Sequence, residues 1–373
     1  MRALLLIPSF VKRETVQEVA NDRHPRMDYD ALANGLRTAG IEIRLLDYGA
    51  VERERALLIR LTCRLAGRDA ALALLGFQQR RWCQVFFTNG ENVAIPLALL
   101  LKLVLQRPGH VTIGHRLSTG KKRLFFTLLR VQGQIDTLFV YARTQWEHAV
   151  HRLEISPEKL SHIHFHADDR FYRPLPERPV SPRRICSAGL EWRDYPTLID
   201  AVRDAPDLDV QLAAASPWSK HRDETAGSSL PAHVAVRCYS YSELRELYAT
   251  SSVVAVPLYE NDFQAGVTTL LEAMAMGKAV VVTRTTGQTD VLVDGENGLL
   301  VAPGDVEGWQ QAISGLLSND AHRERLGRNA RAWVEEHATL DRWVGHLVAA
   351  LQSAATAVPR NRENVAPAVK PNG

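Results

Sequence analysis

The chain has 373 residues, with 45 Lys and Arg against 42 Asp and Glu, and 46% of its residues are hydrophobic. This length favours two domains over a single core, and no apolar run is long enough to span a bilayer. The four cysteines (Cys63, Cys83, Cys186 and Cys238) form no CxxC or Cys/His pattern. This favours reduced thiols in a cytoplasmic setting and argues against a metal site.

Charge is distributed unevenly between the two halves. Residues 1–175 hold 26 Lys and Arg against 17 Asp and Glu, a balance of +9, and the remainder holds 19 against 25, a balance of −6. A basic half suits an anionic partner such as a lipid surface, a phosphorylated acceptor or nucleic acid. An arginine-rich composition without such a partner explains the balance equally well.

Strands alternate with helices in the first half, a pattern that predicts a parallel, doubly wound α/β sheet. The predicted strands are 3–9, 41–48, 83–88, 111–115 and 137–142, followed by HIHFH (162–166), which we interpret as a strand with outward-facing histidines. The predicted helices are 27–40, 52–66, 68–79 and 93–105.

The second half repeats this pattern. Its predicted strands are 184–189, 210–215, 233–238, 252–258 and 278–283, and its helices include 195–202 and 242–250. The proline-rich run RPLPERPVSP predicts a stiff, exposed connection. We therefore expect an N-terminal domain over 1–175, a linker over 176–183, a C-terminal domain over 184–352 and a disordered tail over 353–373.

Residues 260–277 have the composition of a ligand-binding loop and helix between two buried strands. A helix that starts near Thr268 presents unpaired N–H groups to a phosphate, Gly266 permits close approach, and Thr268 and Thr269 add hydroxyl donors. Glu272 lies one turn deeper on the same face, where its carboxylate can accept hydrogen bonds from a ribose diol. The alternative is an ordinary helix start, with Glu272 paired to a distant arginine.

Four motifs occur in a characteristic order: HFHADDRFYRP (164–174), GLEWRDYPTLIDA (189–201), QAGVTTLLEAMAMGKAVVVT (264–283) and TTGQTDVLVDGENGLLVAPGDVEGW (285–309). Together they resemble the family-4 glycosyltransferases, which are retaining enzymes of the GT-B architecture. This architecture has two Rossmann-like doubly wound domains that face each other across a cleft. The resemblance covers residues 140–352 well and 1–140 only loosely.

The resemblance implies a hexosyltransferase that takes sugar from a nucleotide-sugar donor to a hydroxyl acceptor (a glycan, a lipid-linked molecule or a small molecule) without a metal or other cofactor. Glu272 would bind the donor ribose and Arg193 the diphosphate. The other implied donor-binding residues are Gly189, Gly266, Val267, Thr268 and Thr269. His115 would reach the transferred sugar from the N-terminal domain.

Three departures from the family pattern bear on activity. Gln264 stands where the family has the first glutamate of a pair, so it can hydrogen-bond the sugar but cannot act as a carboxylate. Ala188 stands where the family has an arginine. The Gly-Gly turn after the first strand is absent, so the acceptor site differs, and Asp28, Glu91 and Asn92 at predicted strand ends are its candidate contacts.

Two N-terminal stretches, 52–68 and 119–130, combine cations with leucines and phenylalanines. Such basic amphipathic segments suit peripheral contact with an anionic membrane on its cytoplasmic face. The alternative is a helix packed on its own sheet with a solvated charged side.

Three other functions are compatible with this sequence. A GT-B-like epimerase or phosphorylase would share the fold, and a non-catalytic nucleotide-sugar-binding protein would explain Gln264 and Ala188. A nucleic-acid-binding module lacks surface aromatic residues and a recognisable motif, and we therefore expect no nucleic-acid partner.

Overall fold

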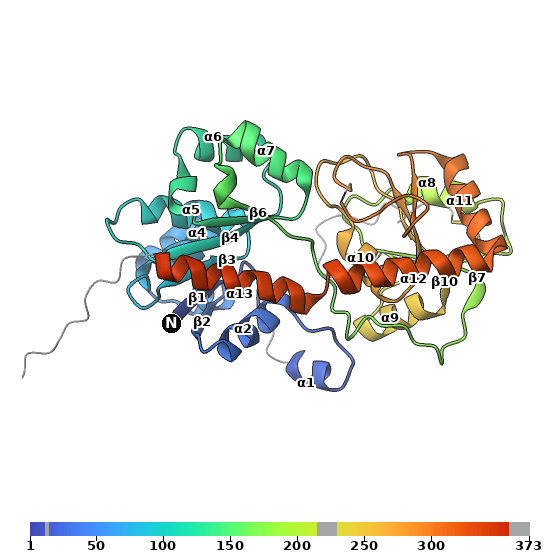
Figure 1. The fold of residues 1–373 in the computed structure, drawn as a ribbon, viewed down its shortest axis with the longest axis horizontal. Coiled ribbons are helices and arrows are strands. Elements are labelled where there is room, and N and C mark those ends of the chain that lie inside the picture. Colours follow the sequence, from blue (N-terminus) through green and yellow to red (C-terminus); the bar gives the residue numbers. More distant parts are fainter. Residues whose placement is uncertain (12–14, 215–229, 289, 358–373) are drawn as a thin grey trace, which may run out of the picture.

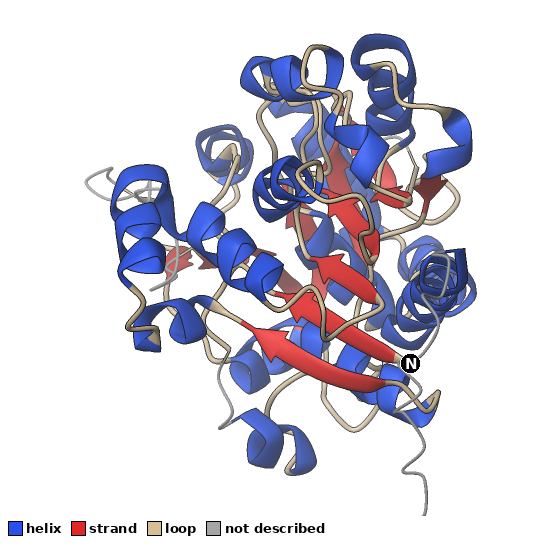
Figure 2. Cartoon of the chain, turned by 90° about the vertical axis from the view of Figure 1, so that its left-hand side faces the viewer, coloured by secondary structure: helices blue, strands red, loops and turns tan. Residues whose placement is uncertain are grey.

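The computed structural model of the chain describes residues 1–11, 15–214, 230–288 and 290–357. Within this part, two six-stranded sheets form two domains, and each strand pair is parallel. The strand orders are β2-β1-β3-β4-β5-β6 and β12-β11-β10-β7-β8-β9. Helices cover the strands of both sheets (Figure 1, Figure 2). The predicted pair of doubly wound parallel sheets is confirmed.

Most inner strands of the two sheets are short, apolar and buried on both faces, as parallel strands under helices are, whereas the edge strands are partly exposed. The N-terminal sheet contains β1 (Arg2–Leu6), β2 (Glu42–Leu46), β3 (Val85–Thr88), β4 (Gly109–Gly114), β5 (Thr137–Val140) and β6 (Leu160–His162). The C-terminal sheet contains β7 (Ser181–Ala188), β8 (Asp209–Ala213), β9 (Val234–Val236), β10 (Ser251–Val256), β11 (Ala279–Thr283) and β12 (Leu299–Val301). Strand β7 thus begins inside the predicted linker.

The helices follow the strands in the alternation that the sequence predicted. Those of the first half are α1 (Thr15–Ala20), α2 (Asp28–Thr38), α3 (Tyr48–Arg53), α4 (Leu57–Gln78), α5 (Glu91–Leu101), α6 (Gly120–Thr127) and α7 (Arg143–Leu153), with 3-10 turns at Val131–Gln134 and Pro157–Lys159. Those of the second half are α8 (Tyr195–Val202), α9 (Tyr241–Thr250), α10 (Val267–Ala275), α11 (Val306–Ser318), α12 (Asp320–His337) and α13 (Leu340–Ala357). Gly67, with a φ of 88°, divides α4 near the boundary predicted between two helices.

The chain crosses back from the C-terminal domain after α12, and α13 packs on the N-terminal domain (Figure 1). Its residues Leu340, Trp343 and Leu347 are buried in one cluster with Leu5 and Val111 of the N-terminal sheet. Residues 340–352, which the sequence placed with the C-terminal domain, therefore complete the N-terminal core. The helix continues to Ala357, so the first five residues of the expected tail are helical; residues 358–373 lie outside the described part of the chain.

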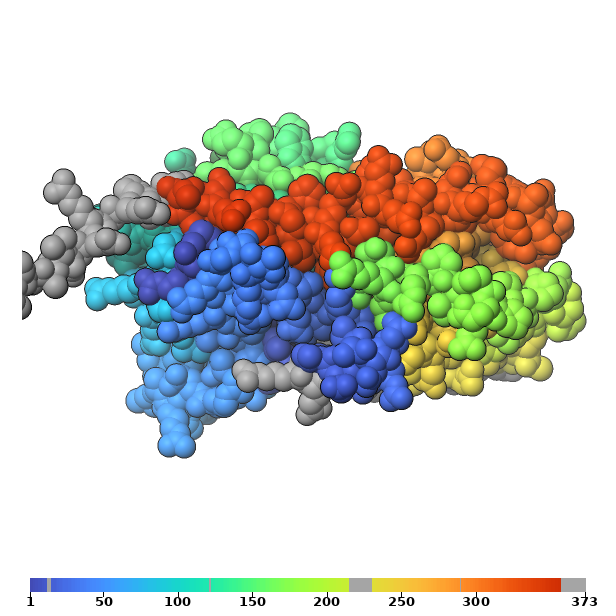
Figure 3. Space-filling model, turned by 60° about the horizontal axis from the view of Figure 1, so that its bottom comes forward, coloured from blue at the N-terminus to red at the C-terminus, as the bar shows by residue number. Residues whose placement is uncertain are grey.

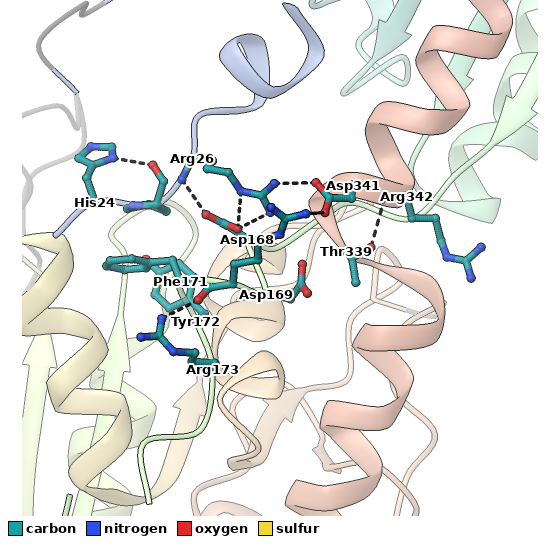
Figure 4. A network of polar contacts seen from close by, with 12 residues as sticks. His24, Arg26, Asp168, Asp169, Phe171, Tyr172, Arg173, Thr339, Asp341 and Arg342 are labelled. Atoms are coloured by element: carbon teal, nitrogen blue, oxygen red, sulfur yellow. Dashed lines mark hydrogen bonds and ion pairs between the residues drawn. The ribbon is translucent and has the colours of Figure 1, made fainter. Parts of the chain in front are cut away.

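Arg26 ties together the two places where the chain crosses between the domains (Figure 4). Its Nη2 lies 2.7 Å from Asp168 Oδ1, and its Nη1 lies 2.6 Å from Asp341 Oδ1. Asp168 follows the last strand of the N-terminal sheet, and Asp341 lies in the first turn of α13. Two ion pairs that share Arg26, one with the buried Asp168 and one with the half-exposed Asp341, therefore fix the outgoing and returning segments to each other.

The histidines of 162–166 do not form an outward-facing strand, because β6 ends at His162. The ring of His164 lies 4.9 Å from that of Trp333, and the ring of His166 lies 4.6 Å from that of Trp343. Burial lowers the pKa of both His164 and His166 to about 4. The period-two pattern was misleading here, since the returning helices cover this segment.

The segment after β1 reaches across to the C-terminal domain. In Figure 3 its dark-blue atoms touch the green and yellow parts of that domain. Arg245 of α9 donates from Nη1 to Asp22 Oδ1 at 2.9 Å, and Arg173 lies 2.8 Å from Asp22 Oδ2. These two arginines lower the pKa of Asp22 to about 2. This long segment, which replaces a short glycine turn, thus acts as an interdomain contact.

Candidate functional site

The carboxyl ends of β4 and β5 in one domain meet the loops after β10 and β11 in the other. Gln145 donates to the carbonyl of Asp262 at 2.8 Å, and the N–H of Arg143 donates to Asp290 Oδ2 at 2.7 Å. Arg116 Nη2 lies 3.5 Å from Asp262 Oδ1. Ligands of doubly wound folds bind at the carboxyl ends of strands, so this interdomain boundary is the candidate site.

Glu272 occupies the buried face of α10, with 8% of its surface exposed. The hydroxyl of Tyr248 donates to its Oε2 at 3.1 Å. Burial raises the pKa of Glu272 to about 7, against the opposing effects of Tyr172, Tyr248 and the Arg193 charge. Glu272 has no ion pair among the described residues, which disfavours the alternative of an ordinary helix paired to a distant arginine.

Arg193 is buried beneath the loop that starts α10. Its Nε donates to the Ala188 carbonyl at 2.8 Å, its Nη1 to the Glu191 carbonyl at 3.1 Å and its Nη2 to Thr269 Oγ1 at 3.0 Å. A guanidinium has five N–H groups, so these bonds orient the group and leave two donors for a ligand. Burial lowers the pKa of Arg193.

Gly266 forms the N-cap of α10 with a φ of 75°, so the helix starts within one residue of the predicted position. A Cβ atom at Gly266 would lie 2.9 Å from Val256 Cγ1 and 3.0 Å from Arg193 Nη1. The loop backbone therefore lies directly on the guanidinium. Val267 is buried and Thr268 is exposed on the first turn, where the helix leaves its N–H groups unpaired.

Thr269 and Gly189 support Arg193 from below. The Thr269 hydroxyl accepts from Arg193 and donates to the Ala188 carbonyl at 3.2 Å, so it is used within the protein. The Gly189 carbonyl accepts from the Tyr195 hydroxyl at 2.6 Å. A Cβ atom at Gly189 would lie 2.5 Å from Arg193 Nη2. Both residues thus position the arginine, and neither offers a free side-chain group to a ligand.

Gln264 lies on the loop before α10, and both polar atoms of its amide are buried without a hydrogen-bond partner among the described residues. Leaving a buried polar group unpaired costs about 1–3 kcal/mol, and such groups are rare in folded proteins. Asn261, Thr285 and Gln288 also have a buried unpartnered atom among the described residues, so unsatisfied polar groups gather on the loops at this boundary.

His115 directly follows β4 and faces this site from the N-terminal domain. Its side chain is exposed, yet its pKa is lowered, mainly because surrounding protein displaces solvent from the ring. Its ring centroid lies 5.6 Å from that of Tyr141.

Glu91 holds the turn that carries His115. Its buried carboxylate accepts from the N–H of His115 at 2.8 Å, from the N–H of Arg116 at 3.1 Å and from Lys122 Nζ at 2.5 Å. Burial acts to raise the pKa of Glu91, but Lys122 and His115 outweigh it and the pKa is lowered. Both carboxylate oxygens of Glu91 thus accept hydrogen bonds within the protein, which argues against a direct contact with an acceptor.

The other two candidate acceptor contacts lie at the same sheet edge. Asp28 accepts from the N–H of Tyr29 at 2.7 Å and from Asn89 Nδ2 at 3.4 Å, and its charge acts on His115. Asn92 is exposed on the first turn of α5. The structure thus brings Asp28 and Glu91 together with His115.

Sequence reasoning missed three residues of this site. Tyr172 and Tyr248 surround Glu272 but come from the segment between β6 and β7 and from α9, with no local signal of their role. Arg116 lies 4.7 Å over the Phe263 ring and 5.5 Å over the Trp192 ring, both in the opposite domain. Its place directly after His115 at a strand end was the one available clue.

Metal ligands and membrane spans can be judged only within the described ranges. There, no three His, Cys, Asp or Glu side chains gather as a metal site would require. In the same ranges, none of the helices combines the length and the apolarity needed to cross a bilayer. Metal independence itself stays a prediction.

Residues 194–333 match the family model "Glycosyl transferases group 1". Two curated relatives are D-inositol 3-phosphate glycosyltransferases. The chain is 37% identical to that of Nocardioides sp. over 105 residues, which is 28% of this chain and 22% of the relative. It is 26% identical to that of Corynebacterium efficiens over 233 residues, which is 56% of this chain and 53% of the relative. The chain thus spans from about a fifth to about half of the length of these relatives.

Solved structures share the fold over nearly the whole chain at low identity. A glycosyltransferase from Rickettsia africae superposes with a TM-score of 0.71 at 14% identity, covering 95% of this chain and 99% of the other. Anabaena HepE, solved in complex with UDP and glucose, gives a TM-score of 0.67 at 14% identity, with the same coverage. The chain therefore has the GT-B fold, and residues 194–333 of its C-terminal half are similar to the group 1 glycosyltransferases.

Proposed function

We propose that this chain is a retaining glycosyltransferase that moves a hexose from a nucleotide-sugar to a hydroxyl acceptor. The observation that carries the proposal is the Gln264 amide beside the start of α10, whose two polar atoms are buried without a partner in the part of the chain that the structure describes. A sugar with several hydroxyl groups supplies the missing donors and acceptors. The group 1 family match over the same segment supports this proposal.

The C-terminal domain would hold the donor. The ribose diol donates to Glu272, and the diphosphate meets the first N–H groups of α10 and the two remaining donors of Arg193. Arg193 is already oriented by three hydrogen bonds, so it needs little rearrangement when negative charge develops on the leaving phosphate. The UDP and UDP-glucose complexes of HepE, which shares the fold, are consistent with such a donor.

The N-terminal domain would complete the reaction site. His115 offers a hydrogen bond to the sugar, and Asp28 and Asn92 lie at the edge where an acceptor would enter. During transfer the bond between the anomeric carbon and the phosphate oxygen breaks, and a bond to the acceptor oxygen forms on the same face. The acceptor proton passes to the leaving phosphate oxygen, so the neutral Gln264 suffices without a carboxylate.

Thermal-shift screening of the full chain against UDP-, GDP-, ADP- and TDP-sugars should identify the donor. Release of nucleotide, alone and with acceptors that include D-inositol 3-phosphate, should then reveal turnover. We expect Glu272→Ala and Arg193→Ala to reduce turnover at least about tenfold, and EDTA to have no effect. NMR of the product should show the anomeric configuration of the donor; inversion would overturn the retaining mechanism.

A second candidate is a nucleotide-sugar-binding protein without catalysis. It is favoured by the loss of charge at Gln264 and by Ala188, whose carbonyl receives Arg193 and whose side chain supplies no cation. Tight binding of one nucleotide-sugar, with no hydrolysis and no transfer to any acceptor tested, would support this candidate over the enzyme.

A further inference from the structure

The first half of α4 exposes four leucines to solvent. Leu57, Leu58, Leu61 and Leu65 are 79%, 56%, 48% and 76% exposed, whereas Ile59 in the same half is completely buried. Isolated exposed apolar residues are ordinary, but a contiguous group on one helix marks an interaction surface. We call these four residues the leucine face.

The leucine face points away from the protein. With 3.6 residues per turn, Leu57, Leu61 and Leu65 lie in one stripe and Leu58 lies beside it. Ile59 points to nearly the opposite side, into a core cluster with Leu72. The helix therefore packs on its own domain through its other side, and the interpretation of 52–68 as a helix with a solvated charged side does not explain the leucines.

Arginines border the leucine face. The segment 52–68 contains five arginines and two glutamates. Glu52 binds Arg68 at 2.8 Å, and Glu54 accepts from the N–H groups of residues 55 and 56. Arg60 and Arg64, one turn apart, are exposed along one border of the leucine face. Cations beside an exposed apolar stripe complement a surface that is both apolar and negatively charged.

We propose that the leucine face and its arginines bind an anionic lipid bilayer. Leucines of an interfacial helix enter the boundary between headgroups and acyl chains, and arginines attract anionic headgroups. The end of this half adjoins the carboxyl edge of the sheet, because Arg68 lies 5.3 Å over the Phe10 ring and 5.9 Å over the Tyr48 ring. Membrane binding would thus bring the catalytic edge of the domain close to lipid.

The second basic stretch, 119–130, differs from α4. The ammonium group of Lys122 donates to Glu91 at 2.5 Å and to the Arg116 carbonyl at 2.6 Å. This lysine therefore fixes the turn of His115 and is not available to lipid. A charge reversal there would disturb the candidate site, so α4 gives the cleaner test.

Sedimentation of the full chain with phosphatidylcholine vesicles, with and without phosphatidylglycerol, tests the proposal. We expect binding to the anionic vesicles only, weakened by salt. Leu61→Ser/Leu65→Ser and Arg60→Glu/Arg64→Glu should each lower the partition coefficient at least about tenfold. The matched controls, Val293→Ser at a site 54% exposed and Arg325→Glu/Arg328→Glu on α12, should leave it unchanged.

Two results would overturn the proposal. One is vesicle binding that is absent, or equal in the α4 variants and the controls. The other is a dimer in analytical ultracentrifugation that Leu61→Ser/Leu65→Ser dissociates without vesicles, which would make the leucine face an interface between two copies. An unchanged unfolding temperature in each variant separates either result from misfolding, and none of them depends on glycosyl transfer.

Discussion

The two halves of the candidate site are built differently. In the C-terminal half, Arg193 follows β7, whereas Gly266 and Glu272 follow β10. Arg193 bonds to the carbonyls of Ala188 and Glu191 nearby in the sequence and to Thr269 of the other unit. In the N-terminal half, His115 is held by Glu91 from another βα unit and Lys122 from α6. The first half orients its arginine through two backbone carbonyls and one hydroxyl, whereas the second holds the turn of its histidine through a single buried carboxylate.

The proposed function gives each half a different role, donor binding to the C-terminal half and acceptor binding to the N-terminal half. Under the proposed function, a diphosphate and a ribose would meet a glycine, an arginine and a carboxylate from two neighbouring βα units. The acceptor side would rest on loops that share one buried carboxylate, Glu91. The N-terminal half should therefore be more sensitive to loss of one remote partner than the C-terminal half.

The largest expected effect is that of Glu91→Ala. It leaves the N–H groups of His115 and Arg116 and the ammonium group of Lys122 without their acceptor, which should lower the free energy of unfolding by about 4 kcal/mol. Urea denaturation measures this. Glu324→Ala, whose carboxylate pairs with Arg328 at 3.6 Å on the exposed surface, is the control and should change it by less than about 1 kcal/mol. Equal losses of unfolding free energy in the two variants would show that Glu91 does not hold the turn of His115 in place.

Glu272→Gln should change the pH dependence of stability. The folded pKa of about 7 lies above the ordinary value of 4.5, so the group stabilises the fold fully below pH 4.5 and this stabilisation is lost as pH rises through 7. The variant stays uncharged and should be more stable than the wild type at pH 8 by up to about 3 kcal/mol. Denaturation at pH 4.5 and 8 without ligand tests this.

Glu335→Gln, at an exposed position of α12, is the control for that experiment. This variant should have the same difference in unfolding free energy between pH 4.5 and pH 8 as the wild type. If the unfolding free energy of Glu272→Gln followed pH in parallel with that of the wild type, burial would not raise the pKa of the Glu272 carboxyl group. Donor affinity of Glu272→Gln should fall despite its greater stability, since an amide accepts less strongly from a diol.

Gly266→Ala tests how closely the loop before α10 lies on Arg193. Both Gly266 and Gly304 have positive φ values (75° and 71°), but a Cβ atom at Gly304 meets nothing within 4 Å. Each substitution strains the backbone similarly, so Gly266→Ala should destabilise by about 2 kcal/mol more than Gly304→Ala because of its contacts. Thermal unfolding of both variants provides the comparison, and equal shifts would contradict the close packing.

The smallest effect is expected for Arg116→Ala, which removes a contact between the domains. Loss of the cation–π contacts of the Arg116 guanidinium with the Phe263 and Trp192 rings should lower the free energy of unfolding by about 1 kcal/mol. The domains should open, which small-angle scattering measures as a larger radius of gyration. Arg284→Ala, which breaks an exposed ion pair with Asp294 inside one domain, should leave the radius unchanged; an equal increase in both variants would refute the role of Arg116.

Local patterns predicted much of the fold. Apolar runs marked most of the strands, and the interval between two of them located α10 to within one residue. The same local reasoning missed β12, whose three residues carry too little signal, and misread 162–166, whose histidines are covered by Trp333 and Trp343. Burial by a distant helix leaves no mark on local periodicity.

The sequence by itself predicted Gly266 and Glu272 as parts of one loop and helix, because they lie close together on one backbone path, and the structure places Arg193 of another βα unit beneath that loop. Only the tertiary structure decided the rest. It showed that Glu91 and Thr269 hold neighbouring groups, that Tyr172 and Tyr248 enclose Glu272, and that α13 belongs to the N-terminal core. The physical reason is that hydrogen bonds, burial and ion pairs act between residues far apart in the chain, whereas spacing describes only near neighbours.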